Sequence, residues 1–398
     1  MAQQRAIIII PTYNERENIS KMIPSLQEVF KLVPHWDMHV LVVDDSSPDE
    51  TGKVVKEFER TFDNVHLLSN KKKQGLGLAY LLGMRYAFDS LGADIIFEFD
   101  ADFSHDPKRI PDFIAAIDSG ADLVLGSRYI KGGSIPDDWG FDRKFLSVVG
   151  NLVNTVVLTH FAIRDWTTGY RAIRKSVFMA VEAEMADQQF TGYTFQIGFL
   201  HKAVRRGFKV VEVPIQFVDR KIGKSKLGPD YIKHALLYIL TARYKEIIVS
   251  RLFKFGVVGG IGFIINFSLL FILSRINTVY ALAETISTLP FLGFVNASGL
   301  ASAIGAEFAI ISNFILNNSW TFQDRQSTDA ISTLLKFLQF NVSSFAAVAI
   351  QLLVVSIGTG LTGQTSLSKT AWLVCATAIG MVVNYTIYSK VIWRSAKK

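Results

Sequence analysis

Two acidic residues, Asp100 and Asp102, follow directly after an apolar segment of the chain, Ile95–Phe99. The segment predicts a buried β-strand, and carboxylates at positions i and i+2 beyond the end of a strand can converge on one cation. Mg²⁺ or Mn²⁺ held by two carboxylates keeps coordination positions for water and phosphate oxygens. The pattern therefore favours a divalent-cation site for a phosphorylated ligand. The alternative is a pair of solvated carboxylates that cap the helix expected after Pro107.

Polar residues also follow two earlier apolar segments. Asp44-Asp45 comes after Met38–Val43, where carboxylates suit the N–H groups of a base or the hydroxyls of a ribose. The motif Pro11-Thr12-Tyr13-Asn14-Glu15 follows Ala6–Ile10. Its proline stiffens a turn, its tyrosine offers a ring face to a base, and its glutamate offers an acceptor. The alternative for the glutamate is a favourable interaction with the N-terminus of the next helix.

The elements that must position these residues alternate between strand and helix signals. The predicted strands are 6–10, 38–43, 65–69, 93–99 and 123–126, and the predicted helices are 15–32, 49–62, 76–91 and 107–119. This order predicts an α/β fold, with a mostly parallel sheet and helices on both faces. Ligands of such sheets bind beyond the carboxyl ends of the strands. The motifs lie at those ends: Pro11–Glu15, Asp44–Ser47, Asp100–His105 and Gly126–Tyr129.

Several common sites are disfavoured. Gly75-Leu76-Gly77 lacks the third glycine of a dinucleotide fingerprint, because position 80 is Tyr80, and the chain has no Walker A motif. A Rossmann dehydrogenase and a P-loop ATPase are therefore disfavoured. The single cysteine, Cys375, excludes a disulfide scaffold and a cysteine-based zinc site. His105 has no neighbouring His or Cys, so we expect it to form hydrogen bonds rather than bind zinc.

Charge is unevenly distributed over the 398 residues. Residues 1–250 carry 32 Lys/Arg and 31 Asp/Glu, whereas residues 251–398 carry 10 and 4. The first composition is typical of a soluble domain and the second of a membrane domain. Most of the net charge of +7 therefore reflects orientation in a bilayer, and we expect no nucleic-acid partner. The chain start has no secretory-signal pattern, so we expect the soluble half to stay cytoplasmic.

The apolar segments of the second half predict four membrane-spanning helices. We place them near 253–274, 298–319, 335–358 and 370–391, with 276–297 as an external loop or re-entrant segment. Four spans return both ends to one side, and most Lys and Arg residues of this half flank the spans on that side. The sequence thus predicts an integral, multi-pass membrane protein with both termini in the cytoplasm.

Residues 230–250 connect the two halves. Apolar residues form one stripe in this segment and basic residues lie off the stripe, which predicts an amphipathic helix on the membrane surface. The alternative is a surface helix that packs on the soluble domain.

The membrane half contains an internal repeat. Lys254-Phe255 opens the first span and Lys336-Phe337 opens the third. Asn313-Phe314 precedes Phe322 by the same interval that separates Asn384-Tyr385 from Trp393. The repeat suggests two related helical hairpins, and the alternative is that spans of similar composition look alike.

Seven motifs follow one another over about residues 4–228: Pro11–Asn18, Asp44–Asp49, Asp100–Pro107, Gly126–Tyr129, Thr168–Ala172, Glu212–Pro214 and Arg220–Leu227. As a set they resemble the polyprenyl/dolichyl-phosphate mannose synthases of glycosyltransferase family 2. The membrane half resembles the GtrA-like four-helix family through Ser312-Asn313-Phe314 and Trp320-Thr321-Phe322. The resemblance implies a GT-A glycosyltransferase domain over 1–229, the interfacial helix over 230–250, and an all-α membrane domain of four transmembrane helices over 251–398.

The resemblance also implies site residues, by motif position. The catalytic residues would be Asp100, Asp102, Arg128 and Arg220. The nucleotide sugar would contact Pro11, Tyr13, Glu15, Val43, Asp44, Asp45, Asp100, Ala101, Asp102, Arg128, Arg220 and Lys226. The acceptor phosphate would contact Arg128, Arg143 and Ser147, and the metal Asp100, Asp102 and Ser104. Many relatives have Gln in place of Ser104, and a hydroxyl is a weaker ligand, so water would assist there.

The implied reaction transfers mannose from GDP-mannose to a polyprenyl or dolichyl phosphate, with Mg²⁺ or Mn²⁺ as the cofactor. The acceptor is already an anion, so the reaction needs no strong general base. Catalysis would depend on positioning and on stabilising the leaving diphosphate. A single in-line attack would invert the anomeric carbon.

Other functions stay open at this point. One is transfer from UDP-glucose or another UDP-sugar to undecaprenyl phosphate. Another is a lipid-linked sugar flippase with a regulatory soluble domain, although intact metal and phosphate motifs favour an enzyme. A processive polysaccharide synthase is disfavoured, because no Gln-x-x-Arg-Trp motif precedes the membrane helices. The expected partners are the nucleotide sugar, the lipid phosphate and the bilayer, and the sequence is compatible with a homo-oligomer.

Overall fold

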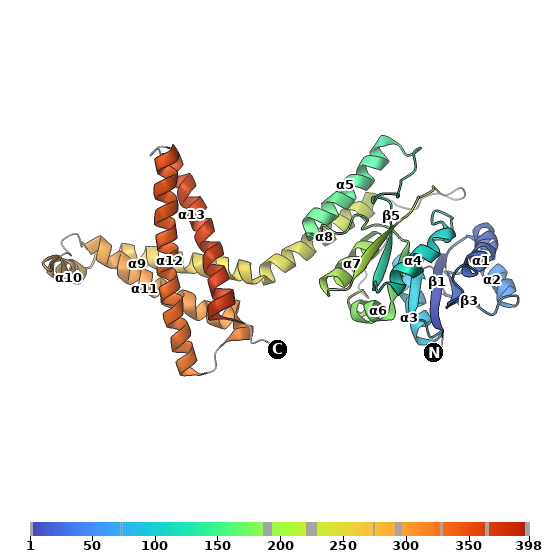
Figure 1. The fold of residues 1–398 in the computed structure, drawn as a ribbon, viewed down its shortest axis with the longest axis horizontal. Coiled ribbons are helices and arrows are strands. Elements are labelled where there is room, and N and C mark those ends of the chain that lie inside the picture. Colours follow the sequence, from blue (N-terminus) through green and yellow to red (C-terminus); the bar gives the residue numbers. More distant parts are fainter. Residues whose placement is uncertain are drawn as a thin grey trace. The chain divides into compact units, whose positions relative to one another are not determined.

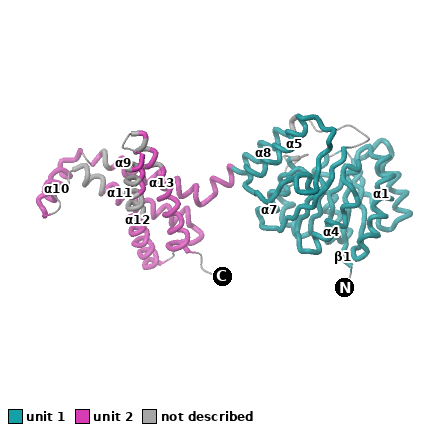
Figure 2. The backbone as a smooth tube through the Cα atoms, turned by 45° about the horizontal axis from the view of Figure 1, so that its top comes forward, with its two compact units in different colours: residues 1–243 teal, residues 244–398 magenta. Residues whose placement is uncertain are grey.

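The computed structural model describes residues 3–71, 73, 75–185, 193–219, 229–273, 275–290, 297–326, 329–362 and 366–394. It divides the chain into two compact units, residues 1–243 and 244–398 (Figure 2). The division falls inside the segment that the sequence predicts to be interfacial.

The first unit contains a seven-stranded sheet in the order β3-β2-β1-β4-β6-β5-β7. Its strands are β1 (Gln4–Thr12), β2 (Trp36–Asp44), β3 (Val65–Ser69), β4 (Ile95–Glu98), β5 (Leu123–Ser127), β6 (Arg171–Arg174) and β7 (Val210–Pro214). Only β6 runs antiparallel to its neighbours, β4 and β5. The five predicted strands are present and the mostly parallel sheet is confirmed. The sequence prediction did not include β6 and β7, and β6 has only four residues with an arginine at each end.

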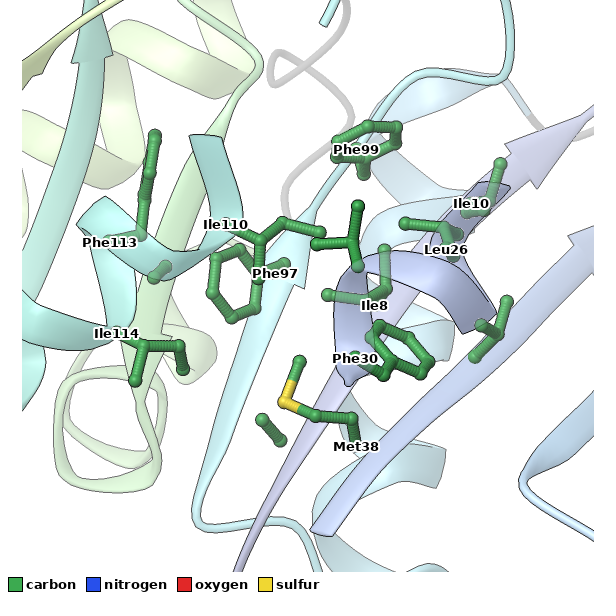
Figure 3. Close-up of a cluster of buried hydrophobic side chains, with 14 of the residues drawn as sticks. Ile8, Ile10, Leu26, Phe30, Met38, Phe97, Phe99, Ile110, Phe113 and Ile114 are labelled. Atoms are coloured by element: carbon green, nitrogen blue, oxygen red, sulfur yellow. The ribbon is translucent and has the colours of Figure 1, made fainter. Parts of the chain in front are cut away.

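Helices cover both faces of this sheet (Figure 1). Alternate residues of β1 enter opposite cores: Ile8 and Ile10 one core, Ile7 and Ile9 the other. The first core packs against α1 (Arg16–Phe30), α2 (Thr51–Glu59) and α4 (Ile110–Asp118). Figure 3 shows part of this core. The second core packs against α3 (Leu76–Asp89), α6 (Lys175–Val181) and α7 (Tyr193–Arg205).

Helix α8 (Pro229–Val249) covers nearly the whole of the predicted interfacial segment. Ile239 is buried in the second core, and Ala235 and Tyr238 pack against it. One side of the helix therefore packs on the soluble unit, as in the alternative that the sequence left open. Other residues of the predicted stripe are exposed: Ile232, Leu236 and Leu240 are 44–51% accessible. A membrane position for that exposed side stays a prediction.

The described part of the second unit is helical. It contains α9 (Arg251–Leu273), α10 (Asn277–Ser287), α11 (Ala297–Leu316), α12 (Ala330–Thr362) and α13 (Ser366–Ile387). The four longer helices coincide with the four predicted spans, and α12 extends beyond its predicted span at both ends. Helix α10 occupies part of the predicted external segment. Within the described residues, one helix, over Arg251–Leu269, is long and apolar enough to cross a membrane by length and composition.

The structure confirms the internal repeat. Helices α11 and α13 each continue into a π-helical turn, Asn317–Thr321 and Tyr388–Ile392 respectively. The N–H of the aromatic residue after each turn bonds to its first carbonyl: Phe322 to Asn317 and Trp393 to Tyr388, both at 2.8 Å. The rings of Phe322 and Trp393 stack nearly parallel, with centroids 4.8 Å apart.

Contacts between the two helical hairpins are reciprocal. Phe255 of α9 packs edge-on against Tyr385 of α13, with centroids 5.7 Å apart. Its counterpart Phe337 of α12 packs edge-on against Phe314 of α11, at 5.2 Å. When residue i contacts j and the counterpart of i contacts the counterpart of j, the halves are related by an approximate twofold axis. The hairpins α9–α11 and α12–α13 thus form a pseudosymmetric pair.

Candidate active site

The motifs Pro11–Glu15, Asp44–Ser47 and Asp100–His105 meet at one edge of the sheet because β1, β2 and β4, which they follow, are neighbours. Pro11 pairs with Val43 in the β1–β2 register, and Ile9 pairs with Glu98 in the β1–β4 register. Pro11 and Asp100 each lie two residues beyond the Ile9–Glu98 pair, so they are at the same level of the sheet. The following predicted residues share this edge: Pro11, Tyr13, Val43, Asp44, Asp45, Asp100, Ala101 and Asp102.

The loops at this edge contain non-glycine residues in the left-handed region. Their φ values are +60° at Asn14, +58° at Ser46 and +61° at Phe103. Such conformations cost of order 1–3 kcal/mol each and cluster at active sites and ligand-binding segments. Hydrogen bonds hold the first two loops, since Asn14 N–H donates to Ser47 Oγ at 3.0 Å and the Ser46 hydroxyl donates to the Asn70 carbonyl. These bonds tie the loops after β1 and β2 to each other and to the end of β3.

Asp44, the last residue of β2, and Asp45, which follows it, have different surroundings, although each is only 5% exposed. The Asp44 carboxylate accepts hydrogen bonds from the Thr12 hydroxyl and from both the hydroxyl and the N–H of Ser47. These bonds to Ser47 close the loop that follows β2. The Asp45 carboxylate accepts a bond of 2.7 Å from the Asn70 side chain at the end of β3.

Glu15 has a partner on its own helix, since the Asn18 amide donates to its carboxylate at 2.7 Å. The Lys73 ammonium lies 4.0 Å from the centre of the Tyr13 ring. One positive charge therefore lies beside the tyrosine that is predicted to bind the base.

Asp100 has contacts through both its side chain and its backbone. The Tyr80 hydroxyl on α3 donates to Oδ1 at 3.2 Å, and His105 Nε2 lies 3.9 Å from Oδ2. His105 Nδ1 accepts the Asp100 N–H at 3.2 Å, so the ring proton is on the nitrogen facing the carboxylate. Burial lowers the pKa of His105 and keeps the ring neutral. The predicted hydrogen-bonding role of His105 is confirmed.

The donor atoms at the end of β4 fit a hard divalent cation. Asp100 and Asp102 are both partly exposed, and their oxygens suit Mg²⁺ or Mn²⁺ completed by phosphate and water. Ser104 is 3% exposed, and its N–H donates to Asp102 Oδ1 at 3.1 Å. Its hydroxyl as a third ligand stays a prediction. In the part of the chain that the structure describes, no group of three His, Cys, Asp or Glu residues could hold a metal.

A buried polar cluster lies behind Asp100. Glu98 and Arg171 are fully buried, and Arg171 Nε is 3.8 Å from a Glu98 carboxylate oxygen. The Arg171 guanidinium donates to the carbonyls of Trp166, Thr168 and Gln196 at 2.8–3.0 Å. It thereby fixes the loop after residue 165 and the first turn of α7 against the catalytic edge.

This cluster predicts a pH effect on stability. Burial raises the pKa of Glu98 to about 7, although Arg171 and the Gln196 amide lower it. Because the folded-state pKa exceeds the ordinary value of 4.5, the folded state loses stability as pH rises from 4.5 to about 7, by at most about 3 kcal/mol. We therefore expect Glu98→Gln to gain stability relative to the unaltered protein over that interval. Thermal unfolding with a chelator present measures this, and a difference that does not change with pH would contradict it.

The arginine after β5 is locked in place. Arg128 Nε and Nη2 each donate to one Asp165 oxygen at 2.7 Å, and Nη2 also donates to the Thr167 hydroxyl at 2.7 Å. The side chains of Arg128 and Asp165 are 7% and 0% exposed. A phosphate could share this guanidinium with Asp165 but could not easily replace the carboxylate.

The predicted acceptor residues lie one turn apart on α5 (Phe141–Leu158). Arg143 donates to both carboxylate oxygens of Asp219, at 2.8 and 3.2 Å, and Ser147 is hydrogen-bonded to the Tyr129 hydroxyl. Tyr129 follows Arg128 directly, so the two acceptor residues and the locked arginine belong to adjoining parts of one site. Arg220 and Lys226, two further predicted site residues, lie outside the described residues.

The family described as Glycosyl transferase family 2 matches residues 7–181, and the GtrA/DPMS transmembrane domain matches residues 254–393. The polyprenol monophosphomannose synthase of Mycolicibacterium smegmatis is 39% identical over 237 residues, which cover 59% of this chain and 86% of that protein. The chain belongs to glycosyltransferase family 2. It is therefore a glycosyltransferase with a GT-A domain and a GtrA-like helical domain, and both predictions are confirmed.

Two further relatives of this family-2 enzyme are similar over most of their lengths. The undecaprenyl-phosphate mannosyltransferase of Micrococcus luteus is 37% identical over 61% of this chain and 96% of that protein. The dolichol-phosphate mannosyltransferase of Pyrococcus furiosus is 32% identical over 331 residues, or 83% of this chain and 84% of that protein. The last match is longer than the soluble unit, so it includes part of the membrane domain.

The sequence prediction missed three residues of the glycosyltransferase site. In the sequence, Tyr80 is notable only because it replaces the third glycine of a dinucleotide fingerprint. In the structure its hydroxyl donates a hydrogen bond to the Asp100 carboxylate. Asp165 had a usable signal, since it is the only acidic residue between Asp142 and Glu182 and lies just before a conspicuous Thr-Gly-Tyr-Arg motif. Asp219 had none, because its partner Arg143 is 76 residues away.

Proposed function

We propose that this enzyme transfers mannose from GDP-mannose to a polyprenyl or dolichyl phosphate, with inversion, at the cytoplasmic face of a membrane. The observation that carries the proposal is the pair Asp100 and Asp102 at the ligand edge of the sheet, in a chain that also has a GtrA/DPMS membrane domain. The names of the three relatives support mannose as the sugar and a polyprenyl-type lipid phosphate as the acceptor.

The residues have distinct roles in this reaction. A divalent cation bound by Asp100 and Asp102 would neutralise charge that develops on the leaving diphosphate. The Tyr80 hydroxyl donates to the Asp100 carboxylate and His105 accepts the Asp100 N–H, which favours one orientation of Asp100 before the sugar donor binds. Pro11, Tyr13 and Asp45 border the nucleoside end of the site, with Lys73 adding positive charge beside Tyr13. The acceptor phosphate attacks as an anion, so the site needs cations and alignment rather than a base.

The exposed face of α5 supports a lipid acceptor. Phe141, Phe145, Val148, Leu152 and Val156 are 47–83% exposed, and their spacing places them in one stripe of the helix. An exposed apolar stripe of this length is typical of a helix that lies in a membrane interface. Arg143 and Ser147 belong to the same helix, so a phosphate headgroup at the interface would be within reach of the site.

The membrane domain supports a multi-pass topology. Its pseudosymmetric hairpins begin and end on one side if each helix spans the bilayer, and parallel repeats of this kind occur in transport proteins. Basic residues favour the cytoplasm for that side. On it lie Arg251, Lys254, Arg325, Lys336, Lys390, Arg394, Lys397 and Lys398, against Arg275 and Lys369 on the other.

Membranes containing the enzyme test the proposal directly. They are incubated with a polyprenyl phosphate and with labelled GDP-mannose, UDP-glucose or UDP-N-acetylglucosamine, with Mg²⁺ or Mn²⁺. We expect label to enter the lipid fraction from GDP-mannose alone, and the product to be β-linked. Labelling from UDP-glucose instead would favour the alternative donor, and the absence of labelling from every donor would refute the transferase proposal.

A further inference from the structure

Among the described residues of the glycosyltransferase unit, two arginines each form a two-point ion pair with one aspartate, and one pair is buried while the other is exposed. The Arg128–Asp165 pair is buried, with side chains 7% and 0% exposed. The Arg143–Asp219 pair is open, with side chains 46% and 36% exposed. Buried pairs are costly to break because the remaining charge is left without solvent. Exposed pairs contribute little, so an incoming anion can replace one partner at small cost.

The open pair is also preorganised. The Arg143 guanidinium carbon lies 3.7 Å from the centre of the Trp139 ring. The Trp139 indole N–H donates to Asp219 Oδ2 at 3.2 Å, and Trp139 itself is 8% exposed and packs against Phe217. The ring thus holds the guanidinium flat, with one edge directed at a carboxylate. That edge is the planar, two-point donor that also matches phosphate oxygens.

We propose that Asp219 occupies the place of the acceptor phosphate, and that the lipid binds by exchanging its phosphate for this carboxylate on Arg143. Trp139 is then a positioning residue, which keeps the guanidinium in its binding orientation during the exchange. This inference rests on the proposed function, in that it takes the acceptor to be a prenyl-type phosphate. It adds a reason for specificity: a dianionic phosphate competes with the carboxylate better than a singly charged or neutral headgroup does.

Equilibrium binding of farnesyl phosphate to the purified full-length enzyme in detergent tests the exchange without requiring sugar transfer. We expect Asp219→Asn to tighten binding about two- to five-fold, the worth of an exposed ion pair. The matched control is Asp142→Asn, which removes the same charge one residue before Arg143. The ion pair that the described structure gives for Arg143 is with Asp219 and not with Asp142. The control should leave the affinity unchanged.

Two more variants show whether the effect acts through the proposed residues. In an Arg143→Ala background, Asp219→Asn should no longer tighten binding, because the exchanged cation is gone. Trp139→Leu should weaken binding, whereas Trp139→Phe, which keeps a ring under the guanidinium, should restore most of it. Thermal unfolding of each variant shows that the fold is intact.

Several outcomes would overturn the inference. They are unchanged or weaker binding by Asp219→Asn, an equal effect of Asp142→Asn, a persistent effect without Arg143, or no binding of farnesyl phosphate by the unaltered enzyme. The proposed function fails on a different result. If farnesyl phosphate binds and responds as expected but no sugar is transferred from GDP-mannose, the phosphate exchange stands and the assigned reaction does not.

Discussion

Asp102→Asn should abolish sugar transfer while leaving the protein folded. Asp102 lies at the ligand edge, is partly exposed, and accepts a hydrogen bond from the Ser104 N–H at 3.1 Å. An amide oxygen still accepts that bond, but it lacks the charge that holds a divalent cation against the diphosphate. The loss of several kcal/mol of stabilisation of the leaving group corresponds to a fall of at least about 10³-fold in turnover. Transfer of labelled mannose to lipid measures it.

The control for this prediction removes an aspartate away from the edge. Asp112→Asn affects an exposed residue of α4 that pairs with Arg109, so activity and thermal unfolding should both be close to those of the unaltered enzyme. If Asp102→Asn kept more than about a tenth of the activity with either Mg²⁺ or Mn²⁺, the metal role of this residue would be wrong.

The sequence was most informative about the strands that form the catalytic edge. Apolar runs such as Ile7–Ile10 and Ile95–Phe97 are buried on both faces of a parallel sheet, so their pattern is continuous and unambiguous. Polar motifs directly after such runs must lie at the carboxyl edge, which is why Asp100 and Asp45 could be placed without a structure. The apolar spans of the second half were predictable for a similar reason, since a spanning helix needs a long uncharged segment.

What the sequence could not supply was the pairing of charges distant along the chain. Arg128 and Arg143 look alike as phosphate-binding candidates, and nothing near either residue in the sequence shows that one is buried against Asp165 and the other is open against Asp219. Strand β6 was missed for a related reason: Arg171 looks like a surface residue, yet it is fully buried because three backbone carbonyls and Glu98 surround it. Tertiary contacts determine whether each of these arginines is buried or exposed, and the local sequence pattern does not predict those contacts.

Asp165→Ala should be among the most destabilising single substitutions in the soluble unit. It removes the carboxylate from a fully buried pair and leaves the Arg128 guanidinium without its main counter-charge, a loss of roughly 3–5 kcal/mol. Burial opposes ionisation of Asp165, but Arg128 and the hydrogen bonds around the carboxylate keep its pKa below the ordinary value of 3.8. The stabilisation is therefore complete above that value and is lost as pH falls through the lowered pKa. Unfolding of the full chain in detergent should show a constant deficit from neutral pH down to about pH 4.

Two comparisons separate the buried pair from ordinary surface charge. Asp219→Ala breaks the exposed pair with Arg143 and should cost at most about 1 kcal/mol. The double variant Arg128→Met/Asp165→Ala removes both buried charges and should recover part of the stability lost in Asp165→Ala, because no unpaired cation remains in the interior. Equal losses for Asp165→Ala and Asp219→Ala would mean that burial does not distinguish the two pairs. The proposed exchange of a carboxylate for a phosphate at Arg143, and not at Arg128, would then lose its physical basis.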